Sequence, residues 1–524
     1  MPSLTPVILL PLVFLVLYFV YQYFGRLRPL NAIPNAHFTA PFFPIWLISI
    51  RYRKRENRTV WESHKRLGPV IRLAPEEISV CTLQGIKTIY GNWDKDTWYE
   101  AFINYEIPPL VAEIQSAPHS AHKRRMANIY SKSFLQNSPD VSNFNRRILT
   151  EGVLPKIATS ATIGSSLDVL RLGYAYGMDV MSAYEFGSAY GTNFLGDDVA
   201  LSGFLAAFTA VKRGVFWAGR LPAMTRALQR IGINLVPQEA MDGQAYMEEK
   251  CWKLCSHLQT ATETNSFTSS STKPVVYSQL YSALEKTLEK TPLSPARGPD
   301  FLRKSVASDM LDHMIAGYES SGIALAYTMY ELCMHPEFQT SLRAELRSVN
   351  PPLMFPISTG DNAFSASVPP PTLPRALDSL PFLNAALYET LRLYPPGAAG
   401  QPRVVPRGGA VLCGYPLPEG IVAHAAAYSV HRNEETFKRA EEWLPERWMG
   451  GKEREVKNWF WAFGSGSRGC IGKEFALQEM LVFLAAVYTN FSTHIVDAEG
   501  IEPADEFIAG PSGGKLILRF EKVE

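Results

Sequence analysis

The sequence predicts a mainly α-helical protein with small β-sheets. Long segments with apolar residues at helical spacing dominate the chain: 201–211, 301–335, 380–393 and 473–488. Short Val- and Ile-rich pieces are typical of strands: 70–73, 78–82 and 516–520. Since 46% of the residues are hydrophobic and 12% aromatic, the chain can bury a large core around a bulky group. Its 524 residues exceed the usual size of one domain, so length alone leaves the number of domains open.

The N-terminus carries a segment that is suited to crossing a membrane. Residues 4–24 contain no charged side chain, and a helix of this length spans about 30 Å of hydrocarbon. Arg26 and Arg28 follow this segment, whereas a cleaved signal peptide begins with basic residues and is shorter. The positive-inside rule then places the rest of the chain in the cytoplasm. We predict a transmembrane anchor over residues 1–25; a buried core helix is the alternative, and Pro11 argues against a fully regular helix.

The next segment contains several prolines: Pro29, Pro34, Pro41 and Pro44. Because proline interrupts helices, we expect residues 26–50 to form a stiff linker near the membrane and residues 51–524 to form the folded domain. The Ser/Thr-rich stretch 260–273 and the Pro/Ser-rich stretch 350–374 are typical of surface loops within that domain.

Charge and cysteine usage exclude several classes of protein. The 51 basic and 50 acidic residues leave a formal charge of +1, which gives no overall field to attract nucleic acid. The six cysteines lack the paired spacing of a zinc site or a small disulfide-rich domain, which fits reduced thiols in the cytosol. Cys251 and Cys255 can share a helix face, and we assign no function to them.

A glycine-rich stretch near the C-terminus surrounds one cysteine and reads Phe463-Gly-Ser-Gly-Ser-Arg468-Gly-Cys470-Ile-Gly472. The helical segment 473–488 follows it directly. Glycines allow the backbone to approach a flat ligand, and amide groups near a helix start can donate hydrogen bonds that keep Cys470 a thiolate. Arg468 is placed to pair with a carboxylate of a bound cofactor. These are the features that iron ligation by a cysteine requires.

The same stretch matches a dinucleotide-binding pattern, Gly464-x-Gly466-x-x-Gly469, so an NAD(P)-dependent oxidoreductase is the alternative from another class. A Rossmann unit requires a preceding buried strand, a following strand that ends in an acidic residue, and several more strands. Little chain remains after Gly469 to supply them. The context therefore favours iron ligation.

The motif Phe-x-x-Gly-x-Arg-x-Cys-x-Gly at 463–472 resembles the haem-binding signature of the cytochrome P-450 superfamily. Glu389-Thr-Leu-Arg392 resembles the Glu-x-x-Arg pair of that family, and Pro-Glu-Arg447-Trp resembles the segment that supplies a second arginine. The resemblance implies a cytochrome P-450 fold, in which a single large catalytic domain holds haem between a long distal helix and the proximal cysteine loop. It also implies that Cys470 is the axial ligand of haem b. Glu389, Arg392 and Arg447 would then form a partly buried network that fixes the ligand loop.

A long helix is expected over 310–334, ended by Pro336, and its middle reads Ala316-Gly-Tyr-Glu319-Ser320-Ser. This is similar to the family's distal-helix motif of a small residue, glycine, any residue, an acid and threonine. The resemblance implies that Glu319 and Ser320 are catalytic residues that deliver protons to iron-bound dioxygen. Serine keeps the hydroxyl of threonine but lacks the methyl group that restricts its rotamer, which affects how tightly oxygen use is coupled to product. A solvent-facing pair of polar residues is the alternative.

Haem propionates need basic partners, because buried charges without partners are costly. Arg403 resembles the family's arginine on the strand that follows the Glu-x-x-Arg helix. His119-x-x-x-Lys123 stands where the family has Trp-x-x-x-Arg and departs from that pattern at both positions. Arg124 is an alternative contact, and a solvated basic run is the other interpretation. The predicted haem-binding set is His119, Lys123, Arg403, Phe463, Arg468 and Cys470.

The activity implied by the resemblance is that of a haem-dependent monooxygenase, which inserts one oxygen atom of dioxygen into a lipophilic small molecule by hydroxylation or epoxidation. Electrons would come from NADPH through a separate membrane-bound flavoprotein reductase. Candidate contacts for the acidic surface of the reductase are Lys452, Arg454, Lys457 and Lys473. The alternative is that these residues are ordinary surface charges. The chain looks like fungal members of secondary-metabolite biosynthesis, with a single-pass anchor in the endoplasmic reticulum membrane and the catalytic domain facing the cytoplasm.

The resemblance suggests which segments line the substrate pocket: 97–109, 204–217, the residues before 319, 397–400 and 507–512. Their mixture of aromatic and small side chains suits a medium-sized lipophilic molecule. An alternative reaction keeps the haem, because family members that rearrange or dehydrate peroxides need no proton-delivering acid and alcohol. Glu319 and Ser320 argue against that alternative.

Overall fold

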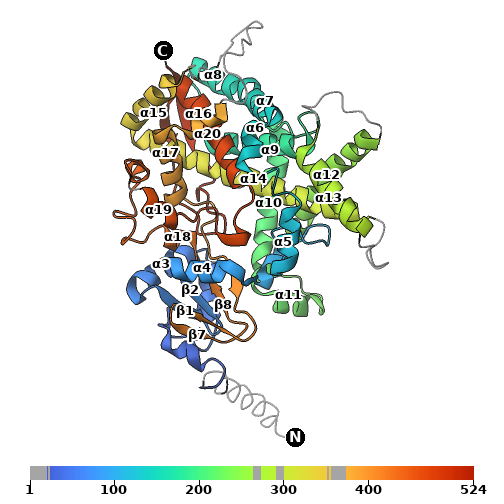
Figure 1. The fold of residues 1–524 in the computed structure, drawn as a ribbon, viewed down its shortest axis with the longest axis vertical. Helices are drawn as coiled ribbons and strands as arrows, with labels where there is room; N and C mark the ends of the chain where they lie inside the picture. Colours follow the sequence, from blue (N-terminus) through green and yellow to red (C-terminus); the bar gives the residue numbers. More distant parts are fainter. Residues whose placement is uncertain are drawn as a thin grey trace.

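The computed structural model describes residues 21, 24–263, 273–290, 300–350, 353, 355, 373–451 and 453–523. The predicted anchor over 1–25 lies almost entirely outside these residues, as do Lys452 and most of the predicted loops at 260–273 and 350–374. In the part of the chain that is described, helices surround a central helix, and a small sheet lies toward the N-terminal end (Figure 1). The predicted fold class, mainly α with small β-sheets, is confirmed.

Helices of very different length make up most of the molecule. The long helices are α9 (Val169–Phe186), α10 (Asp198–Val215), α12 (Gln238–Glu263), α13 (Val275–Lys290), α14 (Phe301–Met334) and α20 (Lys473–Asn490). The shorter α-helices are α2 (Ile45–Tyr52), α3 (Glu56–Leu67), α4 (Leu83–Asn92), α5 (Ser116–Arg124), α6 (Lys132–Asn137), α7 (Pro139–Arg147), α8 (Leu154–Ile163), α11 (Pro222–Gln229), α15 (Pro336–Ser348), α16 (Leu373–Asp378), α17 (Pro381–Leu393), α18 (Ala427–Val430) and α19 (Glu453–Trp459). Short 3-10 or π-helical segments are η1 (Arg28–Ala32), η2 (Thr97–Phe102), η3 (Ile148–Val153), η4 (Phe216–Arg220), η7 (Pro445–Trp448) and η8 (Gly466–Arg468).

The helices predicted from apolar periodicity are all present, as α10, α14, α17 and α20. Local sequence explains where several helices begin. Pro336 and Pro381 occupy the first turns of α15 and α17, where a missing N–H costs nothing. The Asp168 side chain accepts the N–H groups of Leu170 and Arg171 and thereby caps α9.

The central helix α14 is held closely by its neighbours. Its partner α9 approaches through small residues, since a Cβ on Gly173 would lie 3.0 Å from the Cα of Gly322, and a Cβ on Gly177 would lie 3.1 Å from the Cα of Tyr318. The helix α20 packs on α14 as well. Together these helices contribute nearly half of the buried residues of the main apolar core.

Two sheets and a hairpin complete the fold. The larger sheet has the order β1-β2-β8-β5-β3, and its strands are β1 (Val70–Ala74), β2 (Glu77–Val80), β8 (Val422–His424), β5 (Arg403–Val404) and β3 (Asp94–Lys95). The second sheet has the order β4-β10-β9, with β4 (Ser166–Asp168), β10 (Ile517–Lys522) and β9 (Phe491–Asp497). The hairpin joins β6 (Ala410–Leu412) and β7 (Tyr415–Leu417). The three predicted strands correspond to β1, β2 and β10, and the pairing of β3 with β5 places Lys95 opposite Arg403.

The segment predicted as a linker packs onto the folded body. Leu27, Leu30 and Ile33 are buried against the larger sheet and the hairpin, while Leu47 and Ile50 join a neighbouring apolar cluster. The prolines of this segment do limit helix length, as predicted, but apolar side chains between them still reach the core. In the structure the compact part of the chain therefore includes residues before 51.

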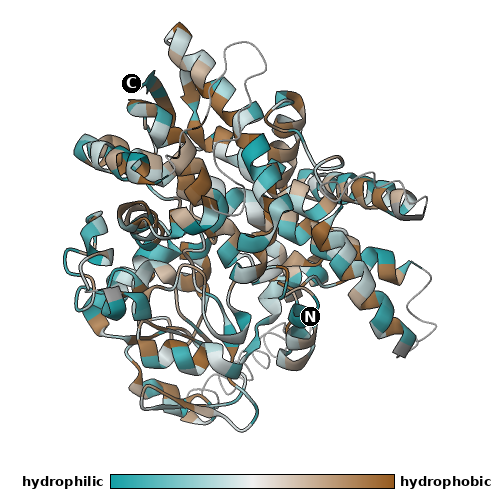
Figure 2. Ribbon diagram, turned by 45° about the horizontal axis from the view of Figure 1, so that its top comes forward, coloured by the Kyte–Doolittle hydropathy of each residue, from teal (hydrophilic) through white to brown (hydrophobic). Residues whose placement is uncertain are grey.

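The helix α10 is unusually apolar for its exposure. Among the described residues, Asp198–Arg220 forms one helical stretch that is long and apolar enough to cross a membrane, and 17% of its most apolar window is buried. Leu201 and Phe204 are buried, and Phe208 contacts Tyr318 of α14. The helix packs mainly on α12 and reaches α14 through the contacts of Phe204 and Phe208 with Tyr318. The outer helices carry a mixture of hydrophobic and hydrophilic residues (Figure 2).

Candidate functional site

Cys470 lies in a tight loop between α19 and α20. Its N–H donates a hydrogen bond of 2.8 Å to the carbonyl oxygen of Phe463, which closes the loop. Gly464 and Gly466 have φ values of +66° and +68°, and a Cβ on Gly466 would collide with the carbonyl oxygen of Tyr90. These glycines follow α19 rather than a buried strand, so the loop lacks the strand-turn-helix context of a dinucleotide-binding unit.

The thiol of Cys470 is accessible to a ligand but has protein around it. Part of the side chain surface is exposed. The protein groups packed around the sulfur reduce its solvation and thereby raise the pKa of the thiol. A hydrogen bond from the Gly472 N–H and the charges of Lys123 and Lys473 lower that pKa. The same groups would stabilise the sulfur as a thiolate when a metal ion replaces its proton.

Two basic side chains hold the cysteine loop in place. The Arg468 guanidinium donates to the carbonyl oxygens of Glu113 and Ile114 at 2.9 and 2.7 Å. The Lys123 ammonium donates to the carbonyl oxygens of Ser467 and Gly469 at 3.0 and 2.7 Å. In the structure, therefore, both residues contact backbone of the loop or of the segment beside it. Arg124, the alternative contact, has an exposed side chain.

A cluster of buried cations lies beside the loop. Arg403 is 1% exposed, donates to the Tyr99 hydroxyl at 2.9 Å and leaves its Nε without a hydrogen-bond partner among the described residues. Lys95 is also buried and donates to backbone carbonyl oxygens, and burial together with Arg403 and Arg468 lowers its pKa. His119 has no partner for Nδ1 among the described residues, and burial, then the charge of Lys95, lowers its pKa to about 2.

These cations fit the propionates of a haem. Lys95 and Arg403 donate only to neutral groups, whereas Arg468 also lies 3.6 Å from the Asp94 carboxylate, so an anion beside Lys95 and Arg403 would be stabilised. A carboxylate group would accept the free Nε of Arg403 and relieve the repulsion among Lys95, Arg403 and Arg468. Sequence reasoning missed Lys95 and Tyr99, because only the pairing of β3 with β5 brings Lys95 next to Arg403.

Glu389 and Arg392 form a fully buried ion pair on α17, with both side chains 0% exposed. The pair is bidentate, with distances of 2.8 Å from Nε and Nη2 of Arg392 to the two carboxylate oxygens. Arg447 and Trp448 of η7 add hydrogen bonds of 3.0 and 2.8 Å to the same carboxylate. Arg392 also donates to the carbonyl oxygens of His431, Ala440 and Glu442. The structure thus brings together Glu389, Arg392 and Arg447, as the sequence predicts.

His431 connects this network to the cysteine loop. Its Nδ1 lies 2.9 Å from the carbonyl oxygen of Arg392, and its Nε2 accepts the N–H of Trp461 at 2.8 Å. The Trp461 indole in turn donates to Ser465 in the loop at 2.9 Å. Burial, and then the charge of Arg392, lowers the pKa of His431 to about 3, so the ring is neutral and can accept. Sequence reasoning missed His431, which no motif marks.

Glu319 and Ser320 lie in the middle of α14 but have separate partners. The Glu319 carboxylate accepts a hydrogen bond from Lys212 of α10 at 2.7 Å, and Lys212 lies 3.7 Å from Glu506. Burial raises the pKa of Glu319, and the charge of Lys212 opposes this rise. The Ser320 hydroxyl donates to the carbonyl oxygen of Ala316 at 2.8 Å. The acid and the alcohol therefore do not contact each other in this conformation.

The segments expected to line the substrate pocket meet near this acid. The ring of Trp98 in η2 lies 4.8 Å from that of Phe507, and a Cβ on Gly219 in η4 would lie 2.7 Å from the Trp98 ring. Tyr52 contacts the rings of Phe216 and Trp217 on its side of η4. An aromatic boundary of this kind suits an apolar ligand.

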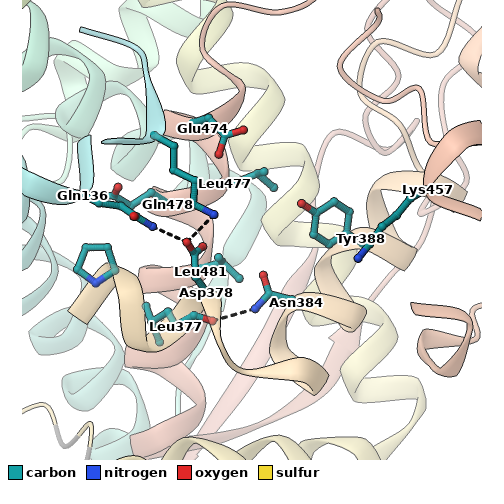
Figure 3. A pocket seen from close by; sticks show the side chains of 12 residues that line it. Gln136, Leu377, Asp378, Asn384, Tyr388, Lys457, Glu474, Leu477, Gln478 and Leu481 are labelled. Carbon is teal, nitrogen blue, oxygen red and sulfur yellow. Dashed lines mark hydrogen bonds and ion pairs between the residues drawn. The ribbon is translucent and has the colours of Figure 1, made fainter. Parts of the chain in front are cut away.

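Two other polar groupings carry no comparable chemistry. Glu56, Glu77 and His424 lie close enough to hold a metal ion, but the Arg51 guanidinium bridges both carboxylates, and Arg220 adds a second positive charge nearby. A surface cavity of about 210 Å³ lies beside α16, α17 and α20 (Figure 3). Among its polar side chains, Lys132 and Gln136 both pair with Asp378, the former at 2.6 Å.

Comparison with known proteins gives a consistent result over nearly the whole chain. A protein-family model described as Cytochrome P450 matches residues 39–518. The chain is 27% identical over 441 residues to cytochrome P450 monooxygenase avaI of Aspergillus versicolor, covering 80% of this chain and 94% of that protein. It is 27% identical over 475 residues to cytochrome P450 67 of Uromyces fabae, covering 87% and 79%. It is 26% identical over 499 residues to cytochrome P450 monooxygenase azaI of Aspergillus niger, covering 86% and 94%.

Proposed function

Since the chain belongs to the cytochrome P450 family, we propose that it inserts one oxygen atom of dioxygen into a lipophilic small molecule, by hydroxylation or epoxidation. Family membership makes it an oxygen-incorporating oxidoreductase of the haem-thiolate type. The observation that carries the proposal is the accessible thiol of Cys470 in a glycine-shaped loop, next to a buried cluster of cations.

On this proposal, different residues would hold the iron, bind the haem propionates and keep the cysteine loop in place. Haem held by Cys470 would supply the activation of dioxygen. Arg403, Lys95 and His119 would bind its propionates. Arg468 and Lys123 would hold the cysteine loop through its backbone, and Phe463 would close that loop through its carbonyl oxygen. The buried network of Glu389, Arg392 and Arg447 would keep the loop rigid.

Proton delivery is assigned to Glu319 and Ser320. Burial raises the pKa of Glu319, which favours a carboxyl group that can act as a proton donor. Its ion pair with Lys212 has to open before the carboxyl can turn toward Ser320. Ser320 carries the hydroxyl group that would pass the proton onward.

Electrons would come from NADPH through a membrane-bound flavoprotein reductase that docks on the cysteine side. Arg454, Lys457 and Lys473 remain candidate contacts. The anchor over residues 1–25, the endoplasmic reticulum membrane and the cytoplasmic orientation are part of the same proposal. Fungal monooxygenases among the relatives support a role in secondary-metabolite biosynthesis.

A carbon monoxide difference spectrum of the reduced protein tests the ligand. Cys470→Ala is expected to abolish the thiolate-type spectrum completely, because no other described residue takes the place of the sulfur. A spectrum typical of histidine-ligated haem in the unaltered protein would contradict the proposal. Metabolite profiles of cells with and without the enzyme would then identify substrate and product together.

One observation favours a second candidate, a haem-thiolate peroxide isomerase or dehydratase. Glu319 is paired with Lys212, and Ser320 with backbone, so neither is aligned for proton delivery in this conformation. The two candidates differ in their need for electrons, because rearranging a peroxide needs no NADPH. Substrate-dependent NADPH consumption in the presence of the reductase supports the monooxygenase and excludes the isomerase.

A further inference from the structure

Glu479 is a buried acid that the proposed reaction does not use. It lies on α20, the helix that follows the Cys470 loop, and it is 2% exposed. The hydroxyl of Ser321 on α14 donates a hydrogen bond to its Oε1. Its Oε2 has no hydrogen-bond partner in the part of the chain that the structure describes. A carboxyl group in this position is costly to bury, which requires an explanation.

Three helices meet at this residue. The Tyr176 hydroxyl of α9 lies 3.0 Å from the Glu479 carbonyl oxygen and 2.7 Å from Oδ1 of Asn145. On the other side of α14, Gly173 packs against Gly322, the residue after Ser321. The other described residues at the contact between α14 and α20 are mainly apolar. Among the described residues, Ser321 and Glu479 form the side-chain hydrogen bond that joins these two helices.

The charge state of Glu479 follows from its surroundings. Burial raises its pKa to about 8, and the hydrogen bond from Ser321 opposes only part of that rise. Ser321 faces it from α14, and Tyr176 is the titratable group that faces it from α9. Neither a cation nor a second acid of the described residues is among the causes of the shift. The carboxyl is therefore mostly neutral at pH 7.

We propose that Glu479 is a positioning residue that ties α14 to α20 through Ser321 and so fixes where the distal residues stand relative to the cysteine loop. Neighbouring residues on an α-helix point about 100° apart, so holding Ser321 toward α20 sets the direction of Ser320 and Glu319. Because α20 begins just after the Cys470 loop, the hydrogen bond connects the two sides of the haem site. This inference rests on the proposed function for the roles of Glu319 and Ser320.

Three variants separate this role from simple core stability. Glu479→Gln keeps a neutral group that can accept from Ser321 but cannot ionise. Ser321→Ala removes the partner. Thr489→Val is the matched control, because Thr489 lies on the same helix, is buried, and its hydroxyl has no partner among the described residues.

The first measurement is the folding equilibrium of the holoprotein against pH. Since the pKa of Glu479 is 4.5 in the unfolded chain and about 8 in the folded one, its burial costs stability as pH rises between these values. Relative to Glu479→Gln, the folding equilibrium constant of the unaltered protein should fall about tenfold per pH unit in this range. Thr489→Val should follow the unaltered protein.

The second measurement is the ferric haem spectrum, followed from about one pH unit below the pKa of Glu479 to about one unit above it. Ionisation of Glu479 strengthens the hydrogen bond that it accepts from Ser321, so the high-spin fraction should shift with pH in the unaltered protein and in Thr489→Val. It should stay constant in Glu479→Gln and be altered at every pH in Ser321→Ala. If stability responds and the haem spectrum does not, Glu479 is only structural and the proposal is overturned. If Glu479→Gln titrates like the unaltered protein in both measurements, the proposal is also overturned. A normal spectrum without NADPH consumption would instead contradict the proposed function.

Discussion

Two opposing effects set the protonation of Glu319. Burial at 7% exposure raises its pKa, while the Lys212 ammonium 2.7 Å away lowers it. For Lys212 the same two effects have the opposite signs: burial lowers its pKa, while the Glu319 and Glu506 carboxylates together raise it by more. Glu319 and Lys212 form an ion pair, so in the proposed reaction the acid would donate a proton only after Lys212 moves away.

Substituting Lys212→Met should make Glu319 hold its proton to higher pH. With the cation gone, burial and the charge of Glu506 are no longer opposed, so the pKa of Glu319 rises further. A proton donor loses activity as it ionises, so the alkaline limb of the pH profile of NADPH consumption should move upward by a similar amount. Lys212→Arg keeps the charge and should leave the limb in place. An unmoved limb in Lys212→Met would show that Glu319 does not control it.

At the scale of elements, the short pairing of β3 with β5 positions two of the residues of the proposed haem site. It sets Lys95 opposite Arg403, and Arg468 reaches the same place from the cysteine loop. On the proposed function, this cluster would replace the tryptophan and arginine of the family's usual helix motif. In the structure His119 and Lys123 lie at the edge of this cluster, with Lys123 on the loop backbone.

Lys95→Met should weaken haem retention without preventing folding. Loss of one charge-assisted contact costs about 1.5–3 kcal/mol, which corresponds to roughly tenfold to hundredfold faster haem loss. Transfer of haem to an apo-globin acceptor measures this rate. Lys87→Met removes an exposed lysine from the adjacent α4 and should leave the rate unchanged. Equal rates for the two variants would exclude Lys95 from the propionate site.

Local motifs indicated more of the residues around Cys470 than of the residues around Glu319 and Ser320. Glycines around Cys470 and the spacing of Glu389 and Arg392 depend on neighbouring residues in the chain, so the sequence records them directly. The partners Lys95 and His431, by contrast, are brought in by strand pairing and loop packing between distant segments. Such contacts leave no periodic pattern, which is why sequence reasoning could not find them.

At the scale of the whole molecule, the question is whether the segment before residue 51 belongs to the folded body. Prolines there predict a linker, because they exclude long helices, but side-chain burial depends on packing and not on helix length. Five large apolar side chains of this segment are at most 9% exposed: Leu27, Leu30, Ile33, Leu47 and Ile50. They cover the larger sheet and the hairpin from the N-terminal side.

Truncation tests this directly. Each of these side chains contributes about 1.5–3 kcal/mol by burial, so together they contribute on the order of 10 kcal/mol. Since a whole domain is stable by only about 5–15 kcal/mol, a chain that starts at Arg51 should fail to fold or should lose most of its thermal stability. A chain that starts at Arg26 keeps all five side chains and should unfold at nearly the same temperature as the full chain. Thermal unfolding of both truncated chains measures the difference, and a stable chain from Arg51 would show that residues 26–50 act as a linker after all.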